Sequence, residues 1–222
     1  MGLISSEATA HQRRGILATV IGVVIFVCVV VGGFVYTMTA PRAMSDAELK
    51  ANGAYLFEAA RDIGDFRLLN ANGQPFVPAD LQGHWSLVFF GFTHCPDICP
   101  TTLALLKQLY DQLEPGLRRS TQVVLVTVDP ARDTPDKLLP YVQYFDPDFV
   151  AVTGEFLDIH RFATALNIPF RKVMLGDGSY TMDHSGNIAL INAKGHYIGF
   201  FKGPQDLARL KATYRAIRAQ AD

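Results

Sequence analysis

The sequence has few cysteines and no concentration of charge of either sign. Three cysteines among 222 residues are too few for a disulfide-stapled scaffold, so stability must come from an ordinary hydrophobic core. Twenty basic residues face 21 acidic ones, which leaves a formal charge of -1 and no basic block that could follow a phosphate backbone. These absences exclude a small disulfide-rich protein and argue against a nucleic-acid partner.

Charged residues are also missing from one long stretch near the N-terminus, residues 15–41. At about 1.5 Å per helical residue the stretch exceeds the ~30 Å hydrocarbon core, which predicts one tilted transmembrane helix. Arg13 and Arg14 precede it, so the positive-inside tendency places residues 1–14 in the cytoplasm and the rest of the chain outside. A cleaved signal peptide is the alternative, but its apolar region usually has only about 7–15 residues.

After the anchor the sequence indicates a linker and one domain. Residues 42–62 are polar to amphipathic and are interpreted as a stalk, and residues 63–222 as the domain. Within the domain, apolar runs such as residues 86–92 and 121–129 alternate with stretches of helical periodicity such as residues 101–113. This alternation predicts an α/β fold, with a mixed sheet covered by helices on both faces.

Two of the cysteines, Cys95 and Cys99, follow the first of these apolar runs. Three residues separate them, and each stands directly before a proline. A residue before proline favours extended backbone, so we expect a tight turn with Cys99 as N-cap and Pro100 as the first helical residue. The helix N-terminus stabilises thiolates there. In open sheets the carboxyl ends of strands carry the chemistry, and this is the thioredoxin-like arrangement. The pair is either a redox couple or a chelate for a soft metal.

Thioredoxin-type exchangers usually have two residues between the cysteines, and the longer loop here lets both sulfurs reach one ion. Soft thiolates favour Cu(I) or zinc, and such an ion would need a third ligand. His184 is the strongest candidate. It follows a predicted hairpin around residues 176–178 and precedes a strand expected beside the cysteine-bearing one, with Asp183 as a potential carboxylate partner for its ring or loop. The pattern alone leaves an ordinary loop histidine open. The remaining candidates are the other histidines after the anchor and two methionines with thioether sulfurs: His84, His94, His160, His196, Met174 and Met182.

Three blocks of the sequence resemble the signatures of a known family. "GFTHCPDICPTTL", "VTVDPARDTP" and "YTMDHSGNIALIN" are similar to those of the Sco/SenC family, membrane-anchored copper-binding proteins needed for cytochrome c oxidase assembly. The resemblance implies a thioredoxin-like fold with an inserted β-hairpin. It also implies one copper, Cu(I) or Cu(II), held by Cys95, Cys99 and His184. Asp183 matches the acid beside the histidine. Asp129, in the second block, is interpreted as structural or partner-facing.

The resemblance implies a copper chaperone that loads the copper A site of cytochrome c oxidase subunit II, with a copper donor protein and a thiol reductant as further partners. A thiol:disulfide oxidoreductase that reduces the cysteines of that site is the alternative, and only metal binding needs His184. A peroxidase of related fold is disfavoured by the paired cysteines, and a purely structural disulfide is the remaining possibility. Without an Arg/Ser-rich transit segment, we expect a bacterial inner membrane with the domain in the periplasm.

Overall fold

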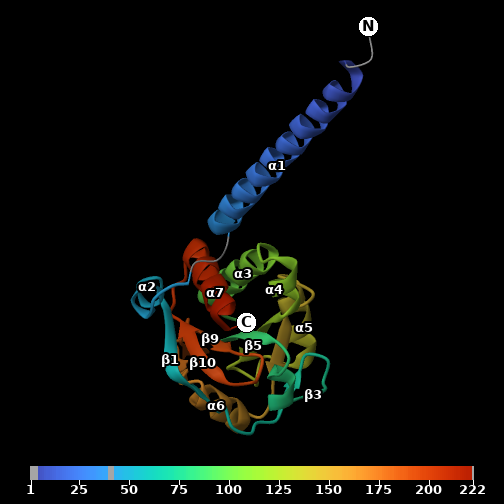
Figure 1. Cartoon of the computed structure of the whole chain (residues 1–222). Coiled ribbons are helices and arrows are strands. Elements are labelled where there is room, and N and C mark those ends of the chain that lie inside the picture. The colour runs from blue at the N-terminus through green and yellow to red at the C-terminus, as the bar shows by residue number, and fades with distance from the viewer. Residues whose placement is uncertain (1–4, 40–42, 222) are drawn as a thin grey trace. The chain divides into compact units, whose positions relative to one another are not determined.

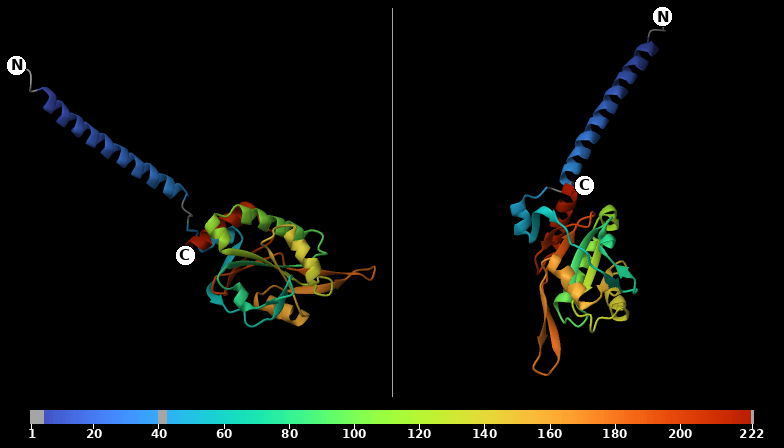
Figure 2. Two further views of the ribbon diagram at one scale, coloured as in Figure 1. Left: turned by 90° about the vertical axis from the view of Figure 1, so that its right-hand side faces the viewer. Right: turned by 90° about the horizontal axis from the view of Figure 1, so that it is seen from below.

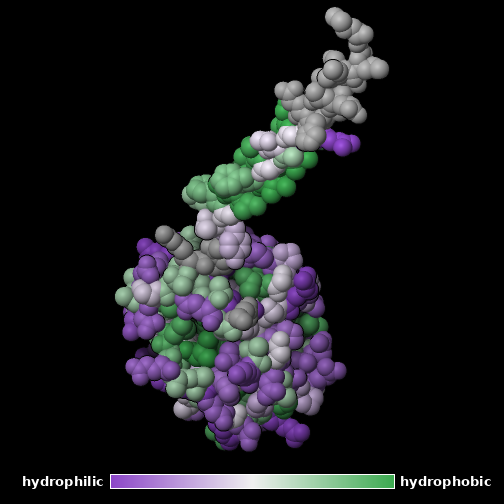
Figure 3. All heavy atoms as spheres, viewed as in Figure 1, coloured by the Kyte–Doolittle hydropathy of each residue, from purple (hydrophilic) through white to green (hydrophobic). Residues whose placement is uncertain are grey.

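The chain has two structural units, which divide between residues 42 and 43. The structure, a computed structural model, describes residues 5–39 and 43–221. The first unit is helix α1 (Ser5–Thr39), drawn in blue in Figure 1. Its segment Arg14–Met38 is long and apolar enough to cross a membrane, and Figure 3 shows it mostly in green. The predicted N-terminal apolar helix is therefore confirmed, while residues 40 and 41 of the expected span lie outside the described residues.

The second unit contains an eight-stranded mixed sheet with the strand order β1-β10-β9-β4-β5-β6-β2-β3 within residues 43–221. Its strands are β1 (Ala54–Arg61), β2 (Leu68–Asn70), β3 (Pro75–Phe76), β4 (Trp85–Gly91), β5 (Thr121–Thr127), β6 (Val150–Thr153), β9 (Ile188–Ile191) and β10 (Tyr197–Phe201). A separate two-stranded hairpin consists of β7 (Phe170–Met174) and β8 (Tyr180–His184). The predicted hairpin insertion is this second sheet.

Helices lie on both faces of the sheet. Figures 1 and 2 show α3 and α7 on one face and α6 on the other. The helices of this unit are α2 (Asp46–Ala51), α3 (Ile98–Asp111), α4 (Pro115–Arg119), α5 (Pro135–Gln143), α6 (Phe156–Ala165) and α7 (Leu207–Ala221), with one 3-10 turn, η1 (Pro78–Leu81). The expected mixed sheet with helices on both sides is thus present.

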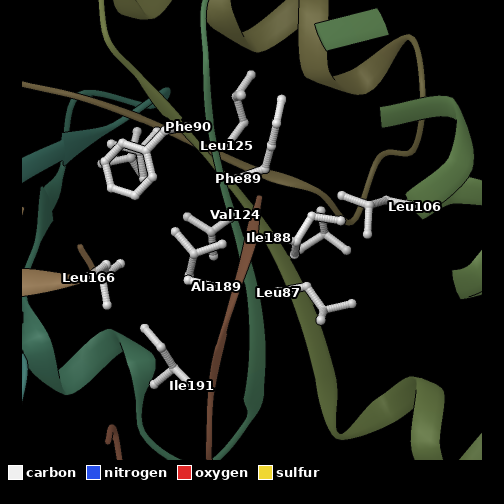
Figure 4. Close-up of a cluster of buried hydrophobic side chains, with 14 of the residues drawn as sticks. Leu87, Phe89, Phe90, Leu106, Val124, Leu125, Leu166, Ile188, Ala189 and Ile191 are labelled. Carbon is white, nitrogen blue, oxygen red and sulfur yellow. The ribbon is translucent and has the colours of Figure 1, made fainter. Parts of the chain in front are cut away.

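Strand β4 lies at the centre of the sheet. It runs parallel to β5 and antiparallel to β9, and each of its seven residues is buried. Successive side chains alternate between the two faces: Figure 4 shows Phe89 on the side of Leu106 of α3, and Phe90 on the side of Leu166 at the end of α6. A strand covered on both faces is expected to be a continuous apolar run, as "SLVFF" is.

The segment predicted to be a stalk is instead part of the domain over residues 46–61. Helix α2 begins at a capping box, in which the Ser45 hydroxyl accepts a hydrogen bond from the Glu48 N–H and the Glu48 carboxylate accepts one from the Ser45 N–H. Leu49 is 2% exposed, and β1 pairs with β10 as the edge strand. The polar composition of this segment did not predict a strand, because an edge strand can form backbone hydrogen bonds with its neighbour while having few apolar side chains.

Removal of this segment is expected to destabilise the domain. A fragment of residues 63–222 lacks the side chain of Leu49, and burial of a leucine contributes about 1.5–3 kcal/mol; it also leaves the edge of β10 unpaired. We expect urea unfolding, followed by circular dichroism, to give a lower midpoint for this fragment than for residues 43–222. Equal midpoints would mean that residues 46–61 contribute no stability to the domain.

Candidate metal centre

The cysteine loop joins the end of β4 to the start of α3. Helix α3 begins at Ile98 with Asp97 as the N-cap, so Cys99 lies inside the first helical turn, and the prediction of Cys99 as N-cap is wrong by two residues. Pro100 is tolerated there because the N–H groups of the first turn have no partner within the helix. The Cys99 N–H donates to the Sγ of Cys95 at 3.4 Å. The turn at residues 95–97 therefore brings the Cys95 sulfur to the start of α3, beside Cys99.

The Cys99 side chain is fully buried, and the Phe92 N–H donates to its Sγ at 3.5 Å. Gly91, the last residue of β4, makes room for this sulfur. A Cβ at position 91 would lie 2.7 Å from the Cys99 Sγ, closer than non-bonded atoms approach. Glycine at the strand end is therefore a steric requirement of the site.

His184 is the last residue of β8 and faces the cysteines. Its Nε2 lies 3.4 Å from the Sγ of Cys99, and its Nδ1 lies 3.1 Å from the backbone oxygen of Ser185. Since a carbonyl oxygen only accepts, Nδ1 carries the proton and the lone pair of Nε2 points toward the sulfur. The rings of Phe89 and Phe92 pack edge-on against the imidazole at centroid distances of 5.9 and 5.7 Å.

Two sulfurs and one imidazole nitrogen thus converge. The ligand atoms of Cys95, Cys99 and His184 all lie within 4.8 Å of one another, and this is the one such group among the described residues. Ligands at about 2.0–2.3 Å from one ion lie up to roughly 4.6 Å apart, so only small shifts would let all three bind it. His94 is not a member of the group, and its Nδ1 lies 3.0 Å from the Thr93 Oγ1 instead.

Comparisons with known proteins point to one family. A family model described as SCO1/SenC matches residues 56–219. A Stutzerimonas stutzeri protein whose name describes it as copper-binding is 40% identical over 166 residues, 75% of this chain and 81% of that protein. The human mitochondrial SCO2 homolog is 39% identical over 149 residues, 66% of this chain and 56% of its own. The crystal structure of Arabidopsis thaliana ScoI with copper bound has 31% identity and a TM-score of 0.65, covering 70% of this chain and 97% of its own.

This chain belongs to the SCO1/SenC family. The family assignment confirms the resemblance seen in the three sequence blocks and the thioredoxin-like fold class.

The two cysteines of this SCO1/SenC protein share one proton unequally. A hydrogen bond from Cys99 lowers the pKa of Cys95 to about 3. The same hydrogen bond, together with burial, raises the pKa of Cys99 far above its ordinary value. Around neutral pH the pair is therefore a half-buried Cys95 thiolate beside a buried Cys99 thiol.

Asp133 belongs to the same sequence block as Asp129, for which a structural or partner-facing role is expected, and its contacts are structural. Its carboxylate is fully buried and accepts hydrogen bonds from the Thr93 N–H at 3.0 Å, from the Thr93 hydroxyl at 2.5 Å and from the Thr127 hydroxyl at 2.6 Å. It thereby ties the start of the cysteine loop to the end of β5. The only sequence signal was its position in the block "VTVDPARDTP".

The two acids expected near the site have different surroundings. Asp183 forms an exposed ion pair with Arg171 at 3.0 Å, and the carbonyl of Ser185 takes the place on the His184 ring that was expected for it. Alternation along β8 explains this, because neighbouring residues point to opposite faces. Asp129 is 3% exposed and accepts a hydrogen bond from the Tyr180 hydroxyl at 3.0 Å, so a structural role fits it better than a partner-facing one.

The low pKa of Cys95 predicts an unusual pH profile for alkylation. The thiolate is the nucleophile, and a group with a pKa of about 3 is already ionised throughout pH 5–8. In reduced, metal-free protein we expect the iodoacetamide rate at Cys95 to be nearly flat over this range, while Cys99 reacts slowly because it is buried and protonated. Mass spectrometry of peptides resolves the cysteines, and urea-unfolded protein is the control. A tenfold rise per pH unit at Cys95 in the folded protein would contradict the assigned charge state.

Proposed function

We propose that this chain is a membrane-anchored copper chaperone that helps to assemble the copper A site of cytochrome c oxidase subunit II. The convergence of Cys95, Cys99 and His184 at the carboxyl end of β4 carries the proposal. Two thiolates and an imidazole are ligands that copper prefers, and soft thiolates favour Cu(I) in particular. The copper-bound Arabidopsis relative and the family membership support copper, one per chain, as the cargo.

The charge distribution suits a site that both loads and releases its metal. Only one of the two sulfurs is ionised before binding, so copper must displace the proton of Cys99 to gain the second thiolate. The half-buried Cys95 is more accessible than Cys99, which is fully buried, so an incoming partner reaches the Cys95 sulfur before the Cys99 sulfur. Transfer to a partner would therefore begin at Cys95.

The alternative function is a thiol:disulfide oxidoreductase acting on the cysteines of the same oxidase subunit. One observation favours it: a half-buried low-pKa thiolate next to a fully buried thiol is the arrangement of an attacking and a resolving cysteine. Cys95 would attack a disulfide sulfur of the partner, and Cys99 would then displace the partner's second thiol. Two electrons leave the pair as it becomes a disulfide, so a thiol reductant must restore it.

Replacement of His184 separates these functions. We expect His184→Ala to weaken Cu(I) binding by about 10- to 100-fold in competition with a chromogenic chelator, because a ligand is lost. The reduction rate of a model disulfide should stay unchanged, since neither cysteine is altered. His94→Ala is the matched control, a histidine beside Cys95 but outside the ligand group, and should bind copper normally. Unchanged copper affinity in His184→Ala would falsify the ligand assignment.

Copper binding can also be compared between the reduced and the oxidised forms of Cys95 and Cys99. Protein oxidised without metal should form a Cys95–Cys99 disulfide, confirmed by a thiol count in the mass spectrometer. It should then take up little copper, because both thiolate ligands are gone. Full copper stoichiometry in that sample would place the metal elsewhere in the chain and leave the oxidoreductase as the better function.

We further propose a bacterial inner-membrane location with residues 1–14 in the cytoplasm and the domain in the periplasm. The apolar segment Arg14–Met38 and the preceding arginines support this orientation. A reporter that is active only in the periplasm should be active when fused after residue 222. An inactive periplasmic reporter combined with an active cytoplasmic one would reverse the orientation.

A further inference from the structure

The hairpin β7–β8 carries His184 but does not belong to the eight-stranded sheet. Its strands pair only with each other, from Phe170 opposite His184 to Met174 opposite Tyr180. In Figure 2 (right) the hairpin, in orange, projects from the body of the domain. An isolated two-stranded hairpin is marginally stable at best, so contacts outside the hairpin must determine where His184 lies.

Phe170 packs against the rings of Phe156 and His160 of α6, and Met182 is buried in the core, so apolar contacts hold one end of the hairpin. Three further residues hold it through polar contacts to the end of β5. The buried carboxylate of Asp129, just beyond β5, accepts hydrogen bonds from the Tyr180 hydroxyl at 3.0 Å and from the Nε of Arg132. Arg132 in turn donates from Nη1 to the Tyr180 backbone oxygen at 3.2 Å, and its guanidinium lies 3.9 Å from the centroid of the Tyr180 ring. We call Asp129, Arg132 and Tyr180 the hairpin clamp.

The clamp is stronger than a surface contact. Its carboxylate is almost fully buried, so its two donors replace lost water, and hydrogen bonds to a buried charge are among the stronger ones in proteins. Tyr180 is engaged at its hydroxyl, its ring and its backbone, and Lys172 from the other strand adds a second cation 3.6 Å from the ring centroid. Tyr180 and the start of β8 are thereby held at the end of β5, and the Lys172 contact joins β7 to the same tyrosine.

A second connection runs from the clamp to the imidazole itself. The guanidinium of Arg132 lies 5.8 Å from the ring centroid of Phe92, and the same ring packs edge-on against the imidazole of His184. The Phe92 N–H also donates to the Cys99 Sγ. Arg132 therefore contacts both the strand that carries His184 and the aromatic ring against which the imidazole packs.

We infer that the hairpin clamp of Asp129, Arg132 and Tyr180 positions His184 for metal binding without touching the metal. The inference rests on the proposed copper function. If the clamp is released, the hairpin samples orientations in which Nε2 points away from the two sulfurs. The apparent affinity then falls by the fraction of molecules in which the imidazole is correctly placed. Asp129, Arg132 and Tyr180 are accordingly positioning residues, and they act through His184 alone.

A double-mutant cycle tests this dependence. Tyr180→Phe keeps the ring and its two cations but removes the hydroxyl that reaches Asp129, and it should weaken Cu(I) affinity about tenfold or more. In the His184→Ala background the same substitution should change affinity by less than about twofold, because the ligand it positions is absent. Asp129→Asn should behave in the same way.

Two controls and two further measurements make the test specific. Asp177→Asn, at the tip of the same hairpin, and Tyr144→Phe, on an exposed tyrosine, repeat the chemical changes outside the clamp and should leave affinity unchanged. In Tyr180→Phe loaded with Cu(II), the nitrogen hyperfine signal of the imidazole should weaken while the thiolate charge-transfer band persists. Amide hydrogen exchange over residues 170–184 of the metal-free variant should be faster than in the wild type.

Each result distinguishes the clamp from the proposed function. Equal losses of affinity in both backgrounds, or no loss in Tyr180→Phe, would overturn the positioning role while leaving copper binding intact. Equal copper affinities of the wild type and His184→Ala would contradict the proposed ligand set. In that case the amide exchange rates of the metal-free proteins test the clamp without reference to copper. Equal rates over residues 170–184 in Tyr180→Phe and the wild type would overturn the clamp.

Discussion

The antiparallel pairing of β9 with β4 is the interaction on which the site depends. Phe89, near the carboxyl end of β4, pairs with Ile188, the first residue of β9. The segment that follows β4 and the segment that precedes β9 must therefore meet at the same edge of the sheet. The first contains both cysteines and the second contains His184, so residues 85 positions apart in sequence come within 3.4 Å. The buried apolar run of β4 thus determines the place of the chemistry.

The site holds one negative charge, on the half-buried Cys95, and keeps the fully buried Cys99 neutral. Two neighbouring thiolates would repel each other next to the buried aromatic rings of Phe89 and Phe92, and the fold avoids this by leaving the proton on Cys99. The same arrangement keeps a nucleophilic sulfur at Cys95, which serves metal capture and disulfide exchange equally well. The shared chemistry explains why the paired cysteines alone do not discriminate between a chaperone and a reductase, and why His184 does.

The candidate third ligand, His184, lies on the hairpin β7–β8, whose strands do not pair with the eight-stranded sheet. Cys95 and Cys99 belong to the junction of a central strand and a helix, whereas His184 belongs to a hairpin outside the main sheet. A ligand on such an element can be placed accurately only through contacts with the body, and Asp129, Arg132 and Tyr180 provide the polar ones. Copper release and copper retention can then be adjusted by changes to this hairpin that leave the sheet and the cysteine loop untouched.

Local patterns in the sequence determined much of this protein. The uncharged stretch around residues 15–41, the buried strand before Cys95 and the hairpin before His184 follow from hydrophobic periodicity and turn residues, which depend on near neighbours in the chain. The resemblance of three blocks pointed to the candidate ligands, and the structure brings them together. Only the tertiary structure decided that residues 46–61 complete the sheet, that Ser185 rather than Asp183 supports the imidazole, and that Asp133 and Tyr180 hold the site together. These contacts join residues distant in sequence, and pairing across such distances is set by the packing of the whole sheet, which no local pattern records.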